Sequence, residues 1–337
     1  MRREGTDMSG KRARMRVFSQ RVAVCLLMAG GAAAADAASA SQGRWISGDS
    51  AAPEKPAPVL ERRFVLERPA RRAELRLAVA GWHELSVNGR RVGDEVLSPV
   101  TCQPDERLSS VSRDVAAFLK KGENVISVLL GNGWFNCFTK EVWGFSSARW
   151  MAAPMICGEL EIDGRVVLVT DGTWQAYDSP IVFNALRNGE RYDARREGSR
   201  PNERRATVVA PPPTVAVSPE DAAPCCMFDP IPPVRVIRAG GGGHIYDFGS
   251  NRTGWCEIEV VGRPGAKVTI DYDECLTPTN TLLGDIACFI RGAGEPRPAQ
   301  HDEYILAGRP DGERWHPRFV YHGGYRVRHG YHSKLPQ

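Results

Sequence analysis

The chain has 337 residues, of which 42% are hydrophobic, 25% charged and 8% aromatic, a composition typical of globular proteins and not of disordered or fibrous ones. Its 34 glycines and 24 prolines indicate many turns, and its length suits about two domains. Residues 1–40 hold seven of the 44 Lys and Arg and three of the 40 Asp and Glu, so the remainder is balanced at 37 of each. This balance excludes the basic surplus on which nucleic-acid binding depends.

The N-terminus has the pattern of a targeting segment. The basic stretch KRARMRVFSQR precedes 14 apolar residues, 22–35, and Ala38-Ser39-Ala40 has the A-x-A form that signal peptidase cleaves. We therefore predict a secretory signal peptide over residues 1–40 and an exported protein, periplasmic or extracellular, that starts near Ser41. The apolar run is shorter than the 20 or so residues that cross a bilayer, so we expect no membrane span.

From residue 63 onward the chain consists of short apolar-polar strands separated by turns. Asn88-Gly89 and Asp163-Gly164 each separate two strand patterns, and both dipeptides favour the type I′ turn of a β-hairpin. Residues 113–120 have the spacing and end signals of one short helix. A second series of strands begins at residue 234 and includes GWCEIEVVG and KVTIDYD.

These patterns predict an all-β protein: two antiparallel β-sandwich, jelly-roll-like domains with one short helix. We expect the first sandwich over residues 41–200, a proline-rich linker over 201–233 and the second sandwich over 234–337. Eight cysteines follow the predicted signal peptide. In an exported chain they are compatible with disulfides, but several lie in strand-like apolar surroundings where a free cysteine is equally at home.

Several stretches, taken in order, resemble the N-terminal region of bacterial α-L-rhamnosidases, which are inverting glycoside hydrolases. They are GRWI at 43–46, ELSVNGRRVGDEVLSP at 84–99, GENVISVLLGNGWF at 122–135, LRNGERYDARRE at 186–197, YDFGSNRTGW at 246–255, PGAKVTIDYDECL at 264–276 and WHPRFVYHGGYRV at 315–327. The resemblance implies two β-sandwich modules ahead of a helical barrel that carries the general acid and general base. The resemblance also implies that this catalytic barrel is missing from the 337 residues.

Other catalytic patterns are absent from the sequence. It contains no G-x-S-x-G nucleophile elbow, no H-E-x-x-H motif, no phosphate-binding loop and no Cys/His spacing suited to zinc. The densest acidic group is Asp271, Asp273 and Glu274, where Asp271 and Asp273 share one face of a strand. We interpret this group as a solvated strand face and assign no catalytic residue.

The segment GNGWFNCFTKEVWGFSSARW at 131–150 is the strongest candidate for binding. Aromatic rings offer apolar platforms for the C–H faces of sugars, and neighbouring amides bind hydroxyl groups. The candidate carbohydrate-binding residues are Asn132, Trp134, Phe135, Asn136, Trp143 and Trp150. The alternative is that these aromatics fill the core or dock on the catalytic barrel. Some family modules bind rhamnose with a calcium ion, so the resemblance adds calcium as an option without assigning its ligands.

The sequence therefore favours the non-catalytic N-terminal portion of an exported α-L-rhamnosidase-like hydrolase. This portion would support the catalytic domain and bind rhamnose-containing oligo- or polysaccharides. Two alternatives stay open: a free-standing carbohydrate-binding module, and a small glycosidase that is active by itself.

Overall fold

The computed structural model describes residues 13–19, 41–48, 54–213, 216–228, 230–239, 243–284 and 287–332. Most of the predicted signal peptide, residues 1–40, lies outside the described residues. Its described part, Ala13–Ser19, is strand β1, which pairs antiparallel with residues 254–260. None of the helices in the described part of the chain is long and apolar enough to cross a membrane.

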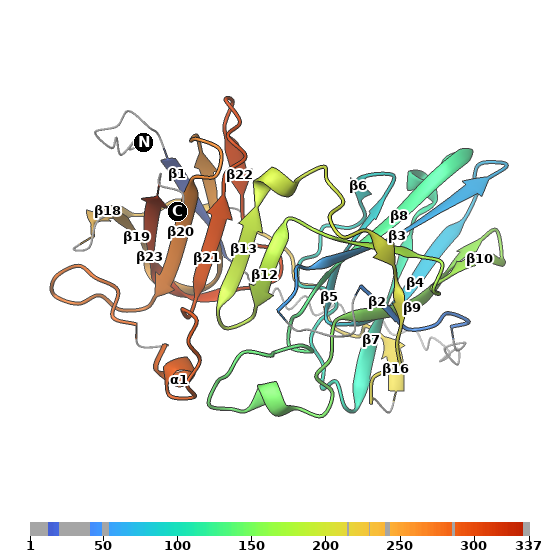
Figure 1. The fold of residues 1–337 in the computed structure, drawn as a ribbon, viewed down its shortest axis with the longest axis horizontal. Coiled ribbons are helices and arrows are strands. Elements are labelled where there is room, and N and C mark those ends of the chain that lie inside the picture. Colours follow the sequence, from blue (N-terminus) through green and yellow to red (C-terminus); the bar gives the residue numbers. More distant parts are fainter. Residues whose placement is uncertain are drawn as a thin grey trace, which may run out of the picture.

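The first domain consists of two sheets that face each other (Figure 1). Its strands are β2 (Ile46–Ser47), β3 (Pro58–Leu66), β4 (Ala73–Ala80), β5 (Trp82–Val87), β6 (Arg90–Arg91), β7 (Arg107–Asp114), β8 (Gly122–Gly131), β9 (Met155–Ile162), β10 (Arg165–Val169), β11 (Gln175–Asp178), β14 (Arg204–Arg205), β15 (Thr207–Val208) and β16 (Ala216–Pro219). One sheet has the order β15-β2-β9-β4-β7-β16, with β10 beside β9, and the other has the order β14-β11-β3-β8-β5-β6.

Strand alternation explains the core between these sheets. Leu75, Leu77 and Val79 on β4 point inward, as do Val128 and Leu130 on β8, and all five are almost fully buried. Every second residue of a strand points to the same face, so one apolar face per strand is enough to form a sandwich. The all-β sandwich prediction is confirmed.

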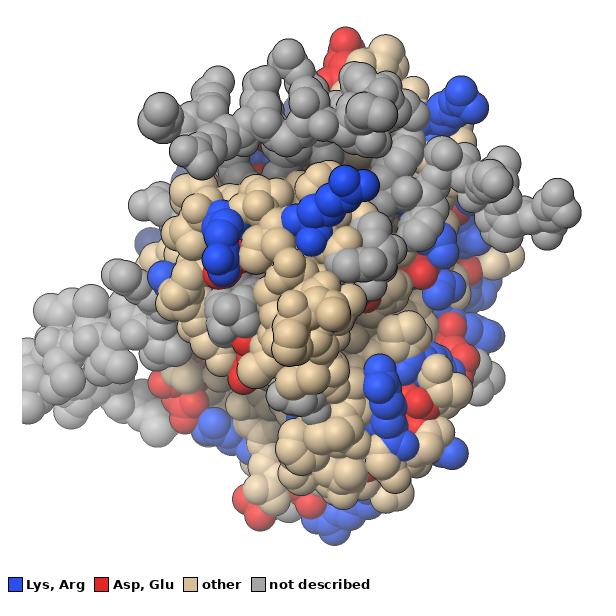
Figure 2. Space-filling view, turned by 90° about the vertical axis from the view of Figure 1, so that its left-hand side faces the viewer, with Lys and Arg blue, Asp and Glu red and all other residues tan. Residues whose placement is uncertain are grey.

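The second domain is built on a ten-stranded sheet. Its elements are β1, β12 (Ile181–Ala185), β13 (Gly189–Asp193), η3 (Ala194–Arg196), β17 (Pro230–Ile231), β18 (Arg235–Arg238), β19 (His244–Val260), β20 (Lys267–Asp273), α1 (Ala287–Arg291), β21 (His301–Ile305), β22 (Glu313–Trp315) and β23 (His322–His332). The main path is β12-β13-β21-β20-β23-β19-β1-β17, and β18 and β22 also pair with β19. Lysine and arginine are interspersed with aspartate and glutamate on the face shown in Figure 2.

Chain segments cross between the two domains. Strands β12 and β13 lie before residue 200 in the sequence, yet β13 pairs in parallel with β21 of the second domain. Conversely, β14, β15 and β16 lie after residue 200 and pair with β11, β2 and β7 of the first domain. The proline-rich stretch therefore contributes strands to the first sandwich up to Pro219.

The structure confirms both predicted hairpins and corrects the predicted helix. Both hairpins form at the expected dipeptides: Asn88 and Asp163 have φ values of 52° and 49°, and the following glycines are also positive. The predicted helix at 113–120 is wrong in extent, because Arg113 and Asp114 pair with β4 and leave only a 3₁₀ turn, η1 (Ala116–Phe118). The α-helix in the described residues is α1 instead. The eight cysteines after residue 40 are all free.

The two domains share an apolar core at their junction. Phe319, with 1% of its surface exposed, packs in one cluster with Trp82 and Leu97 of the first domain and with Trp255 of β19. A Cβ atom on Gly131, at the end of β8, would lie 2.1 Å from Cγ of Phe319. Only glycine allows the ring to approach β8 so closely.

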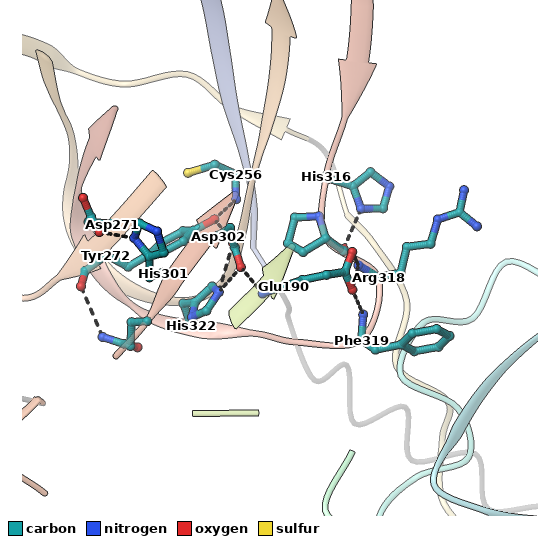
Figure 3. Close-up of polar contacts among 12 residues, drawn as sticks. Glu190, Cys256, Asp271, Tyr272, His301, Asp302, His316, Arg318, Phe319 and His322 are labelled. Atoms are coloured by element: carbon teal, nitrogen blue, oxygen red, sulfur yellow. Dashed lines mark hydrogen bonds and ion pairs between the residues drawn. The ribbon is translucent and has the colours of Figure 1, made fainter. Parts of the chain in front are cut away.

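A buried polar network connects the β12–β13 hairpin with β20, β21 and β23 of the same sheet (Figure 3). The backbone N–H of Glu190 donates to Asp302 (2.8 Å), and the hydroxyl group of Tyr272 donates to the same carboxylate (2.8 Å). His322 Nε2 lies 3.0 Å from Asp302 Oδ2, and neither side chain is exposed. The carboxylate of Glu190 accepts the backbone N–H groups of Arg318 and Phe319. Burial raises the pKa of Glu190 to about 8.

Candidate carbohydrate-binding site

The aromatic segment 131–150 forms the long connection from β8 to β9, with the short 3₁₀ helix η2 (Phe145–Ser147) within it. In Figure 1 it is the green loop below the centre, beside α1 of the second domain. The backbone N–H of Val142 donates to the carbonyl oxygen of Phe289 in α1, at 3.2 Å. The segment therefore lies where elements of both domains meet.

Three of the predicted residues are structural. Asn132 is 5% exposed; its backbone N–H donates to Asn184 Oδ1 and its Nδ2 donates to the carbonyl oxygen of Asn184. Asn136 is 2% exposed and donates to Asn132 Oδ1 at 2.8 Å. Phe135 is 3% exposed and belongs to an apolar cluster with Leu108. Their side chains hold the loop in place and are not available to a sugar.

Trp134 and Trp143 come together around an arginine. The guanidinium carbon of Arg187 lies 4.9 Å from the centre of each indole ring, so the cation lies over both rings. Trp134 also contacts the edge of Phe145, with ring centres 5.3 Å apart. Cation–π contacts of this kind orient both partners and stabilise them.

Trp143 is the exposed member of this group. Its surface is 56% exposed, and its ring lies 5.3 Å from that of Phe289, which is 45% exposed. Val142, at 53%, is exposed beside them. Trp150 belongs elsewhere, because it packs with Trp45 against the cluster that contains Phe135. The structure thus reduces the predicted platform to Trp143, with Trp134 partly covered behind Arg187.

Arg187 and Phe289 are the site residues that the sequence did not single out for binding. The sequence pattern groups Arg187 with Glu190, Tyr192, Asp193 and Arg195 as a charged, turn-adjacent cluster, which we interpret as a structural ion-pair corner. Asp193 and Arg195 do form such a pair, at 2.8 Å, whereas Arg187 lies over the two tryptophans. Phe289 lies 146 residues after Trp143 and has no local signal.

The oxygen atoms of this segment do not fit a calcium site. Calcium needs six to eight converging oxygen ligands. Glu141 uses its carboxylate to accept the backbone N–H groups of Trp143 (2.6 Å) and Phe145 (2.5 Å), and the Asn132 side chain is engaged as described above. Within the described residues, no group of three or more His, Cys, Asp or Glu side chains is placed to hold a metal ion.

The acidic group around residue 272 is not the solvated strand face that the sequence suggests. Asp273 is 2% exposed, and its carboxylate accepts the backbone N–H groups of Glu274 and Gly284, so it holds the loop between β20 and α1. Asp271 lies 2.6 Å from His301 Nδ1. Burial alone would lower the pKa of His301, but hydrogen bonds to Asp271 and Glu303 raise it to about 9. These acids stabilise the domain and form no pair around an open space.

Comparison with known proteins agrees with the fold and with the order of the two domains. Residues 68–226 match the α-L-rhamnosidase N-terminal domain, and residues 237–327 match the bacterial α-L-rhamnosidase concanavalin-like domain. The chain belongs to the α-L-rhamnosidase family. The chain resembles the N-terminal region of these proteins.

Individual rhamnosidases show the extent of this similarity. An α-L-rhamnosidase of Formosa agariphila is 27% identical over 281 residues, which are 77% of this chain and 28% of the relative. One of Streptomyces avermitilis is 29% identical over 265 residues, 75% of this chain and 24% of the relative. The chain thus spans about a quarter of the length of these curated relatives.

Solved rhamnosidase structures share the fold. The α-L-rhamnosidase of Dictyoglumus thermophilum superimposes with a TM-score of 0.72 at 26% identity, over 88% of this chain and 34% of that one. The Streptomyces avermitilis enzyme, solved in complex with L-rhamnose, also has a TM-score of 0.72 at 26% identity, over 84% of this chain and 28% of that one. The rhamnosidase relation therefore extends through both β domains.

Proposed function

We propose that this chain is the non-catalytic N-terminal portion of an exported α-L-rhamnosidase-like glycoside hydrolase, which supports the catalytic domain and binds rhamnose-containing glycans. The order of the two matched domains supports the first part. The exposed indole of Trp143 beside Phe289 supports the second, and it is the observation on which glycan binding rests.

A sugar ring can pack on the exposed part of Trp143, which is 56% exposed and whose orientation is fixed by contacts with Arg187 and Phe289. Rigid aromatic platforms bind sugars with little loss of conformational entropy, since the side chain is already ordered. The exposed side chains of Val142 and Phe289 add to the apolar surface at the indole. We expect affinity in the millimolar to micromolar range, because one platform buries little area.

Hydrolysis by these 337 residues alone is not part of the proposal. Inverting hydrolysis needs two carboxyl groups about 6.5–9.5 Å apart on either side of a sugar. Asp271 and Asp273 are instead engaged in structural hydrogen bonds. We expect no release of rhamnose from a chromogenic rhamnoside.

Calorimetric titration with L-rhamnose, with and without calcium, tests the proposal. The expected result is binding that is lost in Trp143→Ala and kept in Phe228→Ala, an exposed aromatic (37%) outside the platform. A rhamnoside hydrolysis assay runs alongside. Binding that survives Trp143→Ala would overturn the platform, and turnover would overturn the non-catalytic assignment.

Export is tested separately. The intact chain is expressed in a bacterial host, and the mass of the protein recovered from the periplasm or medium is measured. We expect a mature N-terminus near Ser41, and cleavage there would remove β1 from the sheet of the second domain. Recovery of the uncleaved chain in the cytoplasm alone would contradict export.

A further inference from the structure

Arg187 is a cation held without a counter-ion. It lies in the turn between β12 and β13, and its guanidinium lies over Trp134 and Trp143. Among the described residues, no carboxylate forms an ion pair with Arg187, and its Nε–H is buried without an acceptor. Aromatic contacts therefore fix the faces of the guanidinium, and no described side chain accepts a hydrogen bond from its Nε–H.

The acids nearby are engaged with other groups. Glu141, in the same loop as Trp143, accepts the backbone N–H groups of Trp143 and Phe145. Glu295 accepts from Lys140 and pairs with Arg297. An arginine is weakly hydrated and presents a planar fork of donors, so an unpaired one beside a binding platform is a site for an anion.

Arg297 provides an internal comparison. Its guanidinium carbon also lies near two aromatic rings, 5.9 Å from the centres of Phe138 and Phe183. However, Arg297 is paired with Glu295 and Glu54. Within the part of the chain that the structure describes, two arginines beside aromatic residues of the segment 131–150 therefore differ: Arg297 is paired with carboxylates, and Arg187, which contacts the exposed Trp143, is not.

We propose that Arg187 makes the platform selective for acidic glycans, in which a uronate lies next to the sugar that stacks on Trp143. The carboxylate of the uronate would receive hydrogen bonds from the edge of the guanidinium. This inference rests on the proposed function, since it specifies the substrate class of the same site. Planarity favours a carboxylate, which accepts two parallel N–H bonds from an arginine.

Two disaccharides that differ in one group test the inference. One is a glucuronosyl-rhamnose disaccharide, and the other is its carboxyl-reduced counterpart, a glucosyl-rhamnose. We expect the wild-type chain to bind the acid at least ten-fold more tightly in calorimetric titrations at low salt, because hydrogen bonds to charged groups are the stronger ones. The preference should shrink as salt is raised, since part of it is a Coulomb attraction.

Variants separate recognition from structure. Arg187→Gln should remove the preference, because affinity for the acidic disaccharide falls at least ten-fold further than affinity for the neutral one, which loses only the orientation of Trp143. Arg297→Gln, the matched control, should keep the full preference. If Arg187 were only a spacer between the rings, Arg187→Gln would weaken both disaccharides equally, and the inference would be wrong.

Different results would contradict acidic selectivity and glycan binding. Equal binding of the two disaccharides by the wild type overturns the acidic selectivity and leaves glycan binding intact. Binding of neither disaccharide overturns glycan binding and the selectivity together. Thermal unfolding of each variant checks its fold, and the salt dependence of the wild type keeps the test valid if Arg187→Gln is unstable.

Discussion

The domain junction offers the sharpest test of how this fold is held together. Phe319 is 1% exposed and lies in a cluster to which both domains contribute, including Trp82 and Trp255. Its ring is packed against the backbone of Gly131. Phe319→Ala removes this ring without touching a surface group, so the change acts on the shared core.

The expected cost is large. Burying a phenylalanine side chain completely is worth about 1.5–3 kcal/mol, and the cavity left behind adds a further amount, so Phe→Ala in a core costs about 3–5 kcal/mol. Since domains are stable by only about 5–15 kcal/mol in total, this is a substantial fraction. Because the cluster joins the domains, we also expect the wild type to unfold in one transition and the variant to show a broadened or split transition.

Guanidinium unfolding, followed by tryptophan fluorescence and by far-UV circular dichroism, measures both effects. The control is Phe228→Ala, whose side chain is 37% exposed and whose replacement should change the free energy of unfolding by about 0.5 kcal/mol or less. A loss below about 1 kcal/mol in Phe319→Ala would refute the reasoning that this core couples the domains.

Three further predictions concern buried polar groups. The pKa of Glu190 is about 8 in the fold and near 4.5 in the unfolded chain, so the free energy of unfolding should fall as pH rises from 4.5 to 8. Glu190→Gln should flatten this part of the plot of unfolding free energy against pH, and an unchanged slope would contradict the role given to Glu190. The pKa of His301 is raised from 6.5 to about 9, so its contribution to stability is complete below pH 6.5 and lost as pH rises through 9. His301→Gln should abolish that loss when the free energy of unfolding is measured by urea titration across this pH range. Asn184→Ala leaves the buried N–H of Asn132 without an acceptor and should cost about 1–3 kcal/mol, with faster proteolysis in the loop 131–150; wild-type protease resistance would argue against the role given to this amide.

The sequence by itself was sufficient for the fold class and for the turns. Alternating apolar residues in stretches such as AELRLAV specify which face of a strand is buried, whatever the strand pairs with. Asn88-Gly89 and Asp163-Gly164 specify hairpins because their backbone accepts positive φ. These are local properties, so the sequence alone predicts them. The helix predicted at 113–120 is wrong in extent because Arg113 pairs with Leu75, a long-range contact that no local pattern reveals.

Tertiary structure alone decided the site. Asn132, Phe135 and Asn136 have the residue types of a sugar site, but their contacts with distant residues such as Asn184 and Leu108 bury them. No local pattern reveals such burial, because it depends on residues far along the chain.

The same holds for the residues that remain accessible. Trp143 meets Arg187 and Phe289 only because β12–β13 and α1 are brought to one side of the loop by the second domain. Which aromatic stays exposed, and which arginine stays unpaired, follows from how two sheets meet and not from any single stretch of sequence.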